Sequence, residues 1–295
     1  QSIRYLADKY NIEIIETELT DKQKDQNNAK EKLFLICDFA KNYFLNQFNE
    51  SHFGKTIART YFDEREFNDE TLKKFEIGSL GSEKYNLRDH CLSMGYNTDD
   101  LEALGLISSK NQMDIYRSRL IFPIKSISGR TIGFGARILD NNKKSAKYIN
   151  SPDSIIYNKS NVLFGLYNSK NEIVKKDNCF IAEGYTDVMR FHQIGIKNIV
   201  SSSGTALTVS QINLIRRLTK NVTMLFDSDK AGVNATERAV ELLLSQGMNI
   251  DICILPDSED PDSFAKSKST DEINNYIEEN SVSYTHLTLP TKRIV

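Results

Sequence analysis

Cysteine is scarce in this sequence. Only 4 cysteines occur among 295 residues, and no two of them lie close together along the chain. Zinc sites and disulfide frameworks are recognised by closely spaced cysteines and histidines, and the 4 histidines are scattered as well. We therefore expect neither feature within this sequence. Each cysteine has apolar neighbours, which is typical of small core residues in a reducing cytoplasm.

Long apolar runs are also missing. A membrane-spanning helix needs about 18 or more consecutive apolar residues, and no segment approaches that length. The composition, 39% hydrophobic and 26% charged residues, is that of a soluble globular protein. A chain of 295 residues is long enough for about two domains. We expect a cytoplasmic protein without a membrane partner.

The net charge is small, −2, but its distribution along the chain is uneven. Residues 110–176 contain 13 Lys and Arg against 4 Asp and Glu, whereas residues 177–279 contain 9 against 16. A basic block followed by an acidic block indicates a surface for a polyanion beside a site for divalent cations. Two ordinary solvated surfaces explain the charge pattern equally well.

The two ends of the sequence differ from the rest. The chain opens with Gln1 rather than Met, within an amphipathic pattern, so we expect it to begin inside a longer protein. Its last residues, SYTHLTLPTKRIV, resemble translated adapter sequence. We therefore predict that residues 283–295 are a non-native tail and leave them out of the fold prediction.

The first half of the chain predicts a mixed region. Residues 17–32 are almost wholly polar, which indicates a linker or the solvated start of a helix. Residues 33–48 have apolar side chains at helical spacing and predict a packed helix. Short helices and glycine-bearing turns alternate over residues 56–109. Strands are predicted at residues 120–124, 131–134 and 136–139.

From residue 178 onward, strands and helices alternate. The predicted strands span residues 179–182, 199–201, 222–226 and 250–255, and the predicted helices span residues 186–194, 209–218 and 234–244. Such alternation predicts a parallel sheet with right-handed crossovers. The expected fold class is therefore α/β and α+β, with a mixed N-terminal basic subdomain followed by a parallel-sheet α/β subdomain.

Pairs of acidic residues follow three of the predicted strands. They are Glu183 and Asp187 after the first strand, Asp227 and Asp229 after the third, and Asp260 and Asp262 after the fourth. Open parallel sheets carry their chemistry at the carboxyl ends of the strands. Six carboxylates at one edge would repel one another, and Mg²⁺ with oxygen ligands relieves this repulsion. Helix capping by aspartate is the alternative, and it would be preferred for Asp260 and Asp262 alone.

Four segments carry a family resemblance. EGYTD (183–187), SSSGTALT (201–208), FDSDKAG (226–232) and LPDSEDPD (255–262) resemble, in order and spacing, the Toprim domain of bacterial DnaG-type DNA primases. A Toprim domain alone is also found in topoisomerases and recombination proteins.

Four upstream segments narrow the resemblance to primases. RSRLIFPI (117–124), GRTIGFGAR (129–137), KYINSP (147–152) and FGLY (164–167) are similar to the basic half of the same catalytic core, so the resemblance covers roughly residues 1–282. Serine stands at 228 and 258, and alanine at 136, where the family usually has glycine. These replacements change no charged group.

The resemblance implies a division of the chain. Residues 1–30 would be the end of a zinc-module region and a linker, 31–176 the N-terminal basic subdomain, 177–266 the Toprim subdomain, and 267–282 the start of a C-terminal helical connection. Zinc is expected only in the missing N-terminal domain. A replicative helicase would bind through the missing C-terminal domain, and the core is expected to be a monomer.

The resemblance also implies roles for individual residues. Glu183 matches the catalytic acid, proposed for metal binding or proton transfer. The expected ligands of Mg²⁺, or Mn²⁺, are Glu183, Asp187, Asp227, Asp229, Asp260 and Asp262. The residues expected to bind nucleotide or template are Arg65, Arg117, Arg119, Arg137, Lys147 and Lys159.

The implied activity is that of a DNA primase, a nucleotidyltransferase that synthesises short RNA primers from NTPs on single-stranded DNA. Two metal ions and a few cationic side chains suit this reaction. Tyr148, Tyr116 and Phe134 could stack on the template or could belong to the core, which we prefer for Phe134. The alternatives are a non-catalytic Toprim module that binds nucleic acid, and a Toprim nuclease or topoisomerase. A topoisomerase would also need a domain with a nucleophilic tyrosine, and no separate domain is evident.

Overall fold

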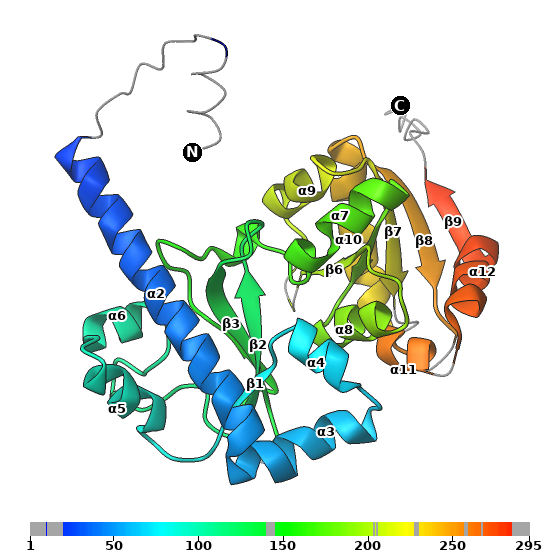
Figure 1. Ribbon diagram of the computed structural model, residues 1–295. Helices are drawn as coiled ribbons and strands as arrows, with labels where there is room; N and C mark the ends of the chain where they lie inside the picture. The colour runs from blue at the N-terminus through cyan, green and yellow to red at the C-terminus, as the bar shows by residue number, and fades with distance from the viewer. Residues whose placement is uncertain are drawn as a thin grey trace.

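The computed structural model contains two β-sheets, each accompanied by helices (Figure 1). It describes residues 10, 20–139, 145–202, 204, 206–226, 230–256, 259–266 and 268–284, and only the backbone of residues 226, 230–237 and 284. None of the helices within these ranges is long and apolar enough to cross a membrane.

A long helix, α2 (Asp21–Glu50), opens the described chain and lies across the first sheet (Figure 1). It begins with a capping box, in which the Thr20 hydroxyl accepts a hydrogen bond from the backbone N–H of Gln23 and the Gln23 side chain accepts one from the N–H of Thr20. From Asp21 onward, a solvated helix start was therefore the right prediction for the polar segment and a linker was wrong. The buried side of the helix begins at Leu33.

Short helices connect α2 to the first sheet. They are the π-helix η1 (Phe53–Ala58), α3 (Arg59–Glu64), α4 (Asp69–Lys74), α5 (Asn86–Ser93) and α6 (Thr98–Ala103). The alternation of short helices and turns is as predicted, but the π-helix was not predicted from the sequence.

The first sheet is antiparallel, with strands in the order β1 (Gly78–Leu80), β2 (Arg119–Lys125), β3 (Thr131–Ile138) and β4 (Tyr148–Asn150). The two strands predicted over residues 131–139 are one strand, because Gly135 stays in register and pairs with Phe122 on one side and Asn150 on the other. Leu33, Phe44 and Phe134 belong to the core between α2 and this sheet. Ala136 is fully buried in the same core.

The second sheet has the order β6-β5-β7-β8-β9. Its strands are β5 (Cys179–Ala182), β6 (Ile199–Ser201), β7 (Asn221–Phe226), β8 (Asn249–Ile254) and β9 (Ser281–Tyr284). The first four are parallel, which confirms the prediction. The antiparallel strand β9, which pairs with β8, was not predicted from the sequence.

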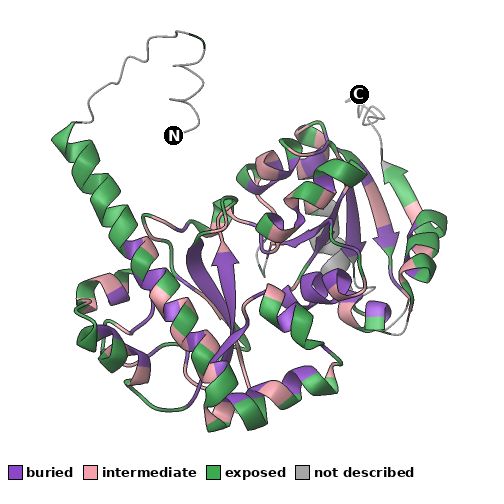
Figure 2. Cartoon of the chain, viewed as in Figure 1, coloured by how far each residue is buried: buried purple, intermediate pink, exposed green. Residues whose placement is uncertain are grey.

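Helices cover both faces of the second sheet. The helices are α7 (Leu166–Lys176), α8 (Tyr185–Gln193), α9 (Val209–Arg216), α10 (Lys230–Ser245), α11 (Pro261–Lys266) and α12 (Thr270–Asn280), with a short 3-10 helix, η2 (Lys159–Asn161), before them. Cys179 and Ile181 of β5 pack with α7, α9 and α10, whereas Phe180 and Ala182 pack with α8, α11 and α12. The parallel strands β5, β6 and β7 are therefore almost completely buried, whereas β8 is buried only at Ile250 and Cys253 (Figure 2).

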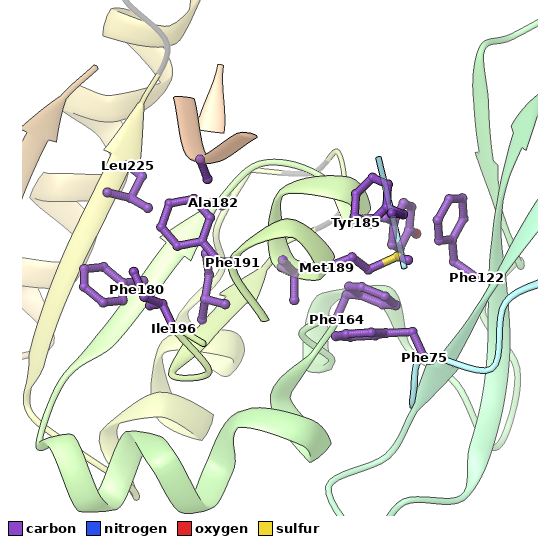
Figure 3. Close-up of a cluster of buried hydrophobic side chains, with 14 of the residues drawn as sticks. Phe75, Phe122, Phe164, Phe180, Ala182, Tyr185, Met189, Phe191, Ile196 and Leu225 are labelled. Atoms are coloured by element: carbon purple, nitrogen blue, oxygen red, sulfur yellow. The ribbon is translucent and has the colours of Figure 1, made fainter. Parts of the chain in front are cut away.

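One hydrophobic core continues from the second sheet to the first. Phe122 of β2 packs with Phe164 and with Tyr185 at the start of α8 (Figure 3). The Phe122 and Tyr185 rings are stacked with centroids 4.8 Å apart. The two sheets are thus joined by packed aromatic side chains. All four cysteines are buried and unpaired, as predicted.

Candidate active site

The carboxyl ends of three neighbouring parallel strands carry the predicted acidic residues. In register, Cys179 of β5 lies beside Val222 of β7, and Val222 lies beside Ile250 of β8. The segments that follow these strands therefore leave the same edge of the sheet. Asp227 and Asp229, which follow β7, lie outside the described residues, as do Ser228 and Ser258.

Glu183 and Asp187 flank the turn between β5 and α8. The carbonyl of Glu183 accepts a hydrogen bond from the Ser201 hydroxyl at 2.6 Å, which ties this turn to the end of β6. The side chain of Asp187 is buried, and its Oδ2 accepts a hydrogen bond from the Gly184 N–H at 2.8 Å. Glu183 is exposed. Asp187 therefore stabilises the start of α8.

Asp260 caps α11. Its Oδ1 accepts a hydrogen bond from the backbone N–H of Ser263 at 2.7 Å, and the Ser263 hydroxyl accepts one from the N–H of Asp260 at 2.9 Å. Helix capping, the alternative that the sequence offered for this residue, is thus what the structure shows. The side chain remains exposed at the edge of the sheet.

Asp262 forms an ion pair with an arginine that the sequence analysis did not select. Arg190 of α8 donates from Nε to Asp262 Oδ1 at 2.7 Å. Arg190 also donates to the carbonyl of Glu66 at 3.3 Å and to that of Arg65. Burial raises the pKa of the Asp262 carboxyl although Arg190 opposes this shift. The signal for Arg190 in the sequence was a charged residue between the apolar Met189 and Phe191.

Arg65 and Arg137 lie against one aromatic ring. The guanidinium carbon of Arg65 is 4.3 Å from the centroid of Tyr61, and that of Arg137 is 4.5 Å from it. Arg137 also donates from Nη1 to the Tyr148 hydroxyl at 3.0 Å. On its other side, Arg65 Nε lies 3.8 Å from Asp262 Oδ2. The structure thus brings two predicted basic residues next to one predicted acidic residue.

The other predicted basic residues are placed differently. Arg119 is buried and donates from Nη1 to the carbonyl of Ala146 at 3.0 Å, so it supports the segment before β4. Burial lowers the pKa of its guanidinium. Lys147 is exposed beside β4, and Lys159 is partly exposed at the start of η2. Arg117 is partly exposed, and its Nη1 is buried without a hydrogen-bond partner among the described residues.

The three aromatic residues considered for template stacking differ in how far they are exposed. Phe134 and Tyr116 are core residues, with 0% and 1% of their surface exposed. This confirms the preference for Phe134 and makes stacking by Tyr116 wrong. Tyr148 is 36% exposed and can stack on a base.

Tyr185 connects the turn between β5 and α8 to the first sheet. Its ring lies between Phe122 and Phe164, with centroids at 4.8 and 4.7 Å, and its hydroxyl donates to Asn150 Oδ1 in β4 (Figure 3). A Cβ atom on Gly135 would lie 2.2 Å from the Tyr185 hydroxyl, so this approach requires glycine in β3. The position of Glu183 relative to Arg137 is therefore fixed by packing.

The structure describes four of the six predicted metal ligands, which are Glu183, Asp187, Asp260 and Asp262. No three His, Cys, Asp or Glu residues of the described chain lie together in a way that could hold a metal ion. Two of the six predicted ligands, Asp227 and Asp229, fall outside these residues. Glu183 and Asp260 are exposed beyond strands that flank β7 on either side. Carboxylates from adjacent strand ends are the ligand type that Mg²⁺ uses, so the donor set fits.

Comparison with known families gives two matches, one over the first sheet and one over the parallel strands of the second. Residues 43–170 match the family described as DNA primase catalytic core, N-terminal domain, and residues 180–265 match the family described as Toprim-like.

Curated relatives extend the similarity along the chain. A DNA primase of Clostridium acetobutylicum is 37% identical over 287 residues, which are 96% of this chain and 46% of the relative. A DNA primase of Staphylococcus aureus is 30% identical over 294 residues, which are 97% of this chain and 48% of the relative. The chain thus spans about half the length of these relatives.

Solved structures share the fold. A DnaG catalytic core has a TM-score of 0.77 at 31% identity, over 85% of this chain and 80% of that one. A DnaG primase catalytic domain bound to ssDNA has a TM-score of 0.77 at 30% identity, over 86% and 82% of the two chains. The zinc-binding and RNA polymerase domains of the Aquifex aeolicus primase give 0.79 at 32% identity, over 96% and 67%.

Proposed function

Because the chain belongs to the family of DnaG-type DNA primase catalytic cores, we propose that it synthesises short RNA primers on single-stranded DNA. Its substrates would be NTPs, a DNA template and the growing RNA primer. Within the whole protein, zinc would belong to a preceding domain and a replicative helicase would bind through a following one. The core would act as a monomer in the cytoplasm.

One observation carries this proposal: a basic cluster, formed by Arg65 after α3 and Arg137 in β3, meets the acidic edge of the second sheet. Arg65 lies 3.8 Å from Asp262 and shares the Tyr61 ring with Arg137. Nucleotidyl transfer depends mainly on positioning the phosphates and neutralising their charge. Cationic side chains beside a carboxylate-rich edge provide both functions.

The residues would divide the reaction as follows. Arg65 and Arg137 would bind the phosphates of the incoming NTP, and Lys147 and Lys159 would contact template or nucleotide phosphates. Tyr148 would stack on a base. Glu183 and Asp260, with Asp227 and Asp229, would hold Mg²⁺ or Mn²⁺. When bound, the metal supplies positive charge to the reacting phosphate and lowers the pKa of the attacking hydroxyl.

Asp187 and Asp262 are proposed to act less directly. Asp187 holds the start of α8 through Gly184, and Asp262 is paired with Arg190. Both would orient the segments that carry Glu183 and Asp260. Arg119, which is buried, would support β4 in the same way.

The test is primer synthesis on single-stranded DNA with labelled NTPs and Mg²⁺. We expect RNA products from the unaltered protein and at least a hundredfold loss in Glu183→Gln, because removing one electrostatic contact to the transition state costs about 10²–10³ in rate. Glu278→Gln, the same change at an exposed position of α12, is the matched control. Strand cleavage instead of synthesis would indicate a Toprim nuclease or topoisomerase, and binding without either reaction would indicate a non-catalytic module.

Thermal unfolding with and without Mg²⁺ adds a test of the metal site. Mg²⁺ at about 100 times its dissociation constant should stabilise the unaltered protein by about 2.7 kcal/mol. Glu183→Gln should lose most of this gain. Without metal it should be as stable as the unaltered protein or slightly more stable, because one repelling carboxylate is gone. Equal loss of stability with and without Mg²⁺ would contradict a metal role for Glu183.

A further inference from the structure

Tyr61 of α3 is almost completely buried, 9% exposed, between two positively charged side chains and the core. The guanidinium carbons of Arg65 and Arg137 are 4.3 and 4.5 Å from its ring centroid. Because both distances end at the same ring, the two cations are held near each other despite their repulsion. The negative face of an aromatic ring attracts such cations and offsets part of that repulsion.

The groups that contact the two arginines determine whether their positive charge is available to a ligand. A carboxylate that paired with Arg137 would cancel its charge, but no ion pair of Arg137 occurs among the described residues. Its contacts are the Tyr61 ring, the Tyr148 ring at 5.5 Å and the Tyr148 hydroxyl. These groups fix the guanidinium without neutralising it. Within the described chain, Arg137 is therefore held by aromatic groups and not by a carboxylate, which suits a ligand with several negative charges.

Arg65 differs from Arg137 in one respect. It lies on the Tyr61 ring and 3.8 Å from Asp262, which is itself held by Arg190 at 2.7 Å. At this distance the Arg65–Asp262 contact is a weak ion pair, and the Tyr61 ring is the other support of the Arg65 guanidinium. Tyr61 is thus the side chain that both arginines contact.

We propose that Tyr61 is a positioning residue, whose ring sets the spacing of Arg65 and Arg137 for the phosphates of an incoming nucleoside triphosphate. This inference rests on the proposed function of the site. Tyr61 would not touch the nucleotide. It would act through the two arginines, and its loss should weaken nucleotide binding more than it slows the chemical step.

The hydroxyl of Tyr61 can be removed without removing the ring, which provides a control. It is buried and has no hydrogen-bond partner within the described part of the chain. The contacts with Arg65 and Arg137 are made by the ring, so phenylalanine should position the arginines nearly as well. Leucine removes the ring, and methionine removes it while keeping a long apolar side chain that can fill the space.

The experiment is primer extension with increasing NTP, combined with titration of fluorescently labelled ATP in the presence of Mg²⁺. We expect Tyr61→Leu and Tyr61→Met to raise the KM for NTP and the Kd of labelled ATP about tenfold, because two cation–π contacts are lost. The kcat should change less than KM. Tyr61→Phe should stay within about twofold of the unaltered protein in both constants.

Two controls separate positioning from general destabilisation. Ile215→Ala removes a fully buried side chain of α9 and should lower the Tm without changing the KM. Tyr85→Leu removes a comparable contact, with Arg88 at 4.0 Å from the ring, from the region of α5. It should change neither KM nor Kd.

Several outcomes would overturn the inference. Tyr61→Met with unchanged KM and Kd would show that the arginines do not need the ring. Tyr61→Phe with a loss as large as Tyr61→Met would assign the role to the hydroxyl instead. If the unaltered protein binds labelled ATP and makes primers, either result overturns this inference alone. If it does neither, the proposed function fails and this inference fails with it.

Discussion

At the residue scale, Arg190 shows how one buried charge organises the site. Its side chain is 3% exposed, packs against the Phe67 ring with its guanidinium carbon 4.1 Å from the centroid, and forms an ion pair with Asp262. It also donates to the carbonyls of Arg65 and Glu66. Arg190 therefore connects α8, α11 and the segment after α3. Removing one partner of a buried pair leaves the other without compensation, which is the costly case.

We predict that Arg190→Leu lowers the free energy of unfolding by about 3–5 kcal/mol, because Asp262 then stays buried with only the distant Arg65 to balance it. The double variant Arg190→Leu with Asp262→Asn should recover more than half of this loss, since the uncompensated charge is gone. Chemical denaturation without metal measures both. Arg130→Leu removes an exposed ion pair with Glu31 and should cost no more than about 1 kcal/mol. A double variant that is less stable than Arg190→Leu would contradict the charge argument.

Individual residues also show where sequence reasoning stops. The strand-end acids could be located from the pattern because alternating strands and helices make the strands parallel, so their carboxyl ends meet at one edge of the sheet. That pattern does not reveal which protein groups the acids contact: Asp187 and Asp260 accept hydrogen bonds at helix starts, and Asp262 pairs with Arg190. Those partners come from side-chain directions in the folded chain. Tyr61 was missed for the same reason, since one tyrosine in a short helix carries no signal.

At the element scale, a buried histidine joins α4, α7 and α8. The Ser169 hydroxyl donates its only hydrogen to the carbonyl of Ile199 at 2.7 Å, so it must accept from His192 Nε2 at 3.0 Å. The other nitrogen, Nδ1, then accepts from Lys74 Nζ at 2.8 Å. Burial, with help from the nearby Lys74 and Lys197, lowers the pKa of His192 to about 3. The imidazole is therefore neutral in the folded protein.

This arrangement predicts an acid-sensitive interface. The folded pKa lies below the ordinary value of 6.5, so between pH 6.5 and 3 the unfolded chain binds more protons. The stabilising contribution of neutral His192 is complete above pH 6.5 and is lost as the pH falls, by up to about 1.4 kcal/mol per pH unit. We expect His192→Gln to lose less stability than the unaltered protein between pH 7 and 5. Denaturant titrations at both values measure this.

The exposed His52 provides the control for the pH prediction. His52→Gln makes the same substitution away from the interface and should keep the pH dependence of the unaltered protein. If His192→Gln kept it too, burial of a neutral imidazole would not be its source.

The elements themselves were largely predictable. The parallel strands were located within one residue because apolar runs bounded by turns define them. The start of α2 at Asp21 was not located, because a capping box starts the helix within a polar segment. The single strand β3 was predicted as two strands, because its glycine interrupts the apolar pattern but not the strand. The strands β1, β4 and β9 have only three or four residues and are formed by pairing with the neighbouring strands β2, β3 and β8. Unlike β5 and β6, which are equally short, these three strands lie outside the alternation of strands and helices over residues 179–255 that makes a strand of this length predictable.

At the scale of the whole molecule, the two sheets share one hydrophobic core. Phe75 and Phe122 come from the region of the first sheet, whereas Phe164, which pairs with Ser201 of β6, and Tyr185 reach them from the region of the second sheet (Figure 3). Phe75 and Phe164 are stacked with centroids 5.6 Å apart. The site lies where the two regions meet, so the packing that joins the sheets also aligns the acidic edge with the basic cluster.

This shared core predicts that the two regions unfold together. Hydrogen exchange followed by mass spectrometry at increasing denaturant can report separately on peptides from β2–β3 and from β5–β7. In the unaltered protein, both sets should lose protection at the same denaturant concentration. Phe122→Ala removes a fully buried ring from the junction and should cost about 3–5 kcal/mol. Because that ring joins the sheets, we expect the two sets of peptides to lose protection at different concentrations in this variant.

Leu101→Ala distinguishes loss of coupling from loss of stability. Leu101 of α6 is fully buried in the core beneath α2, which contains no residue of the second sheet. Its replacement should lower stability by about 2–5 kcal/mol, yet it leaves the contacts between Phe122, Phe164 and Tyr185 intact. Both sets of peptides should therefore lose protection together at a lower denaturant concentration. Separate transitions already present in the unaltered protein, or a common transition retained in Phe122→Ala, would show that the aromatic junction does not couple the two sheets.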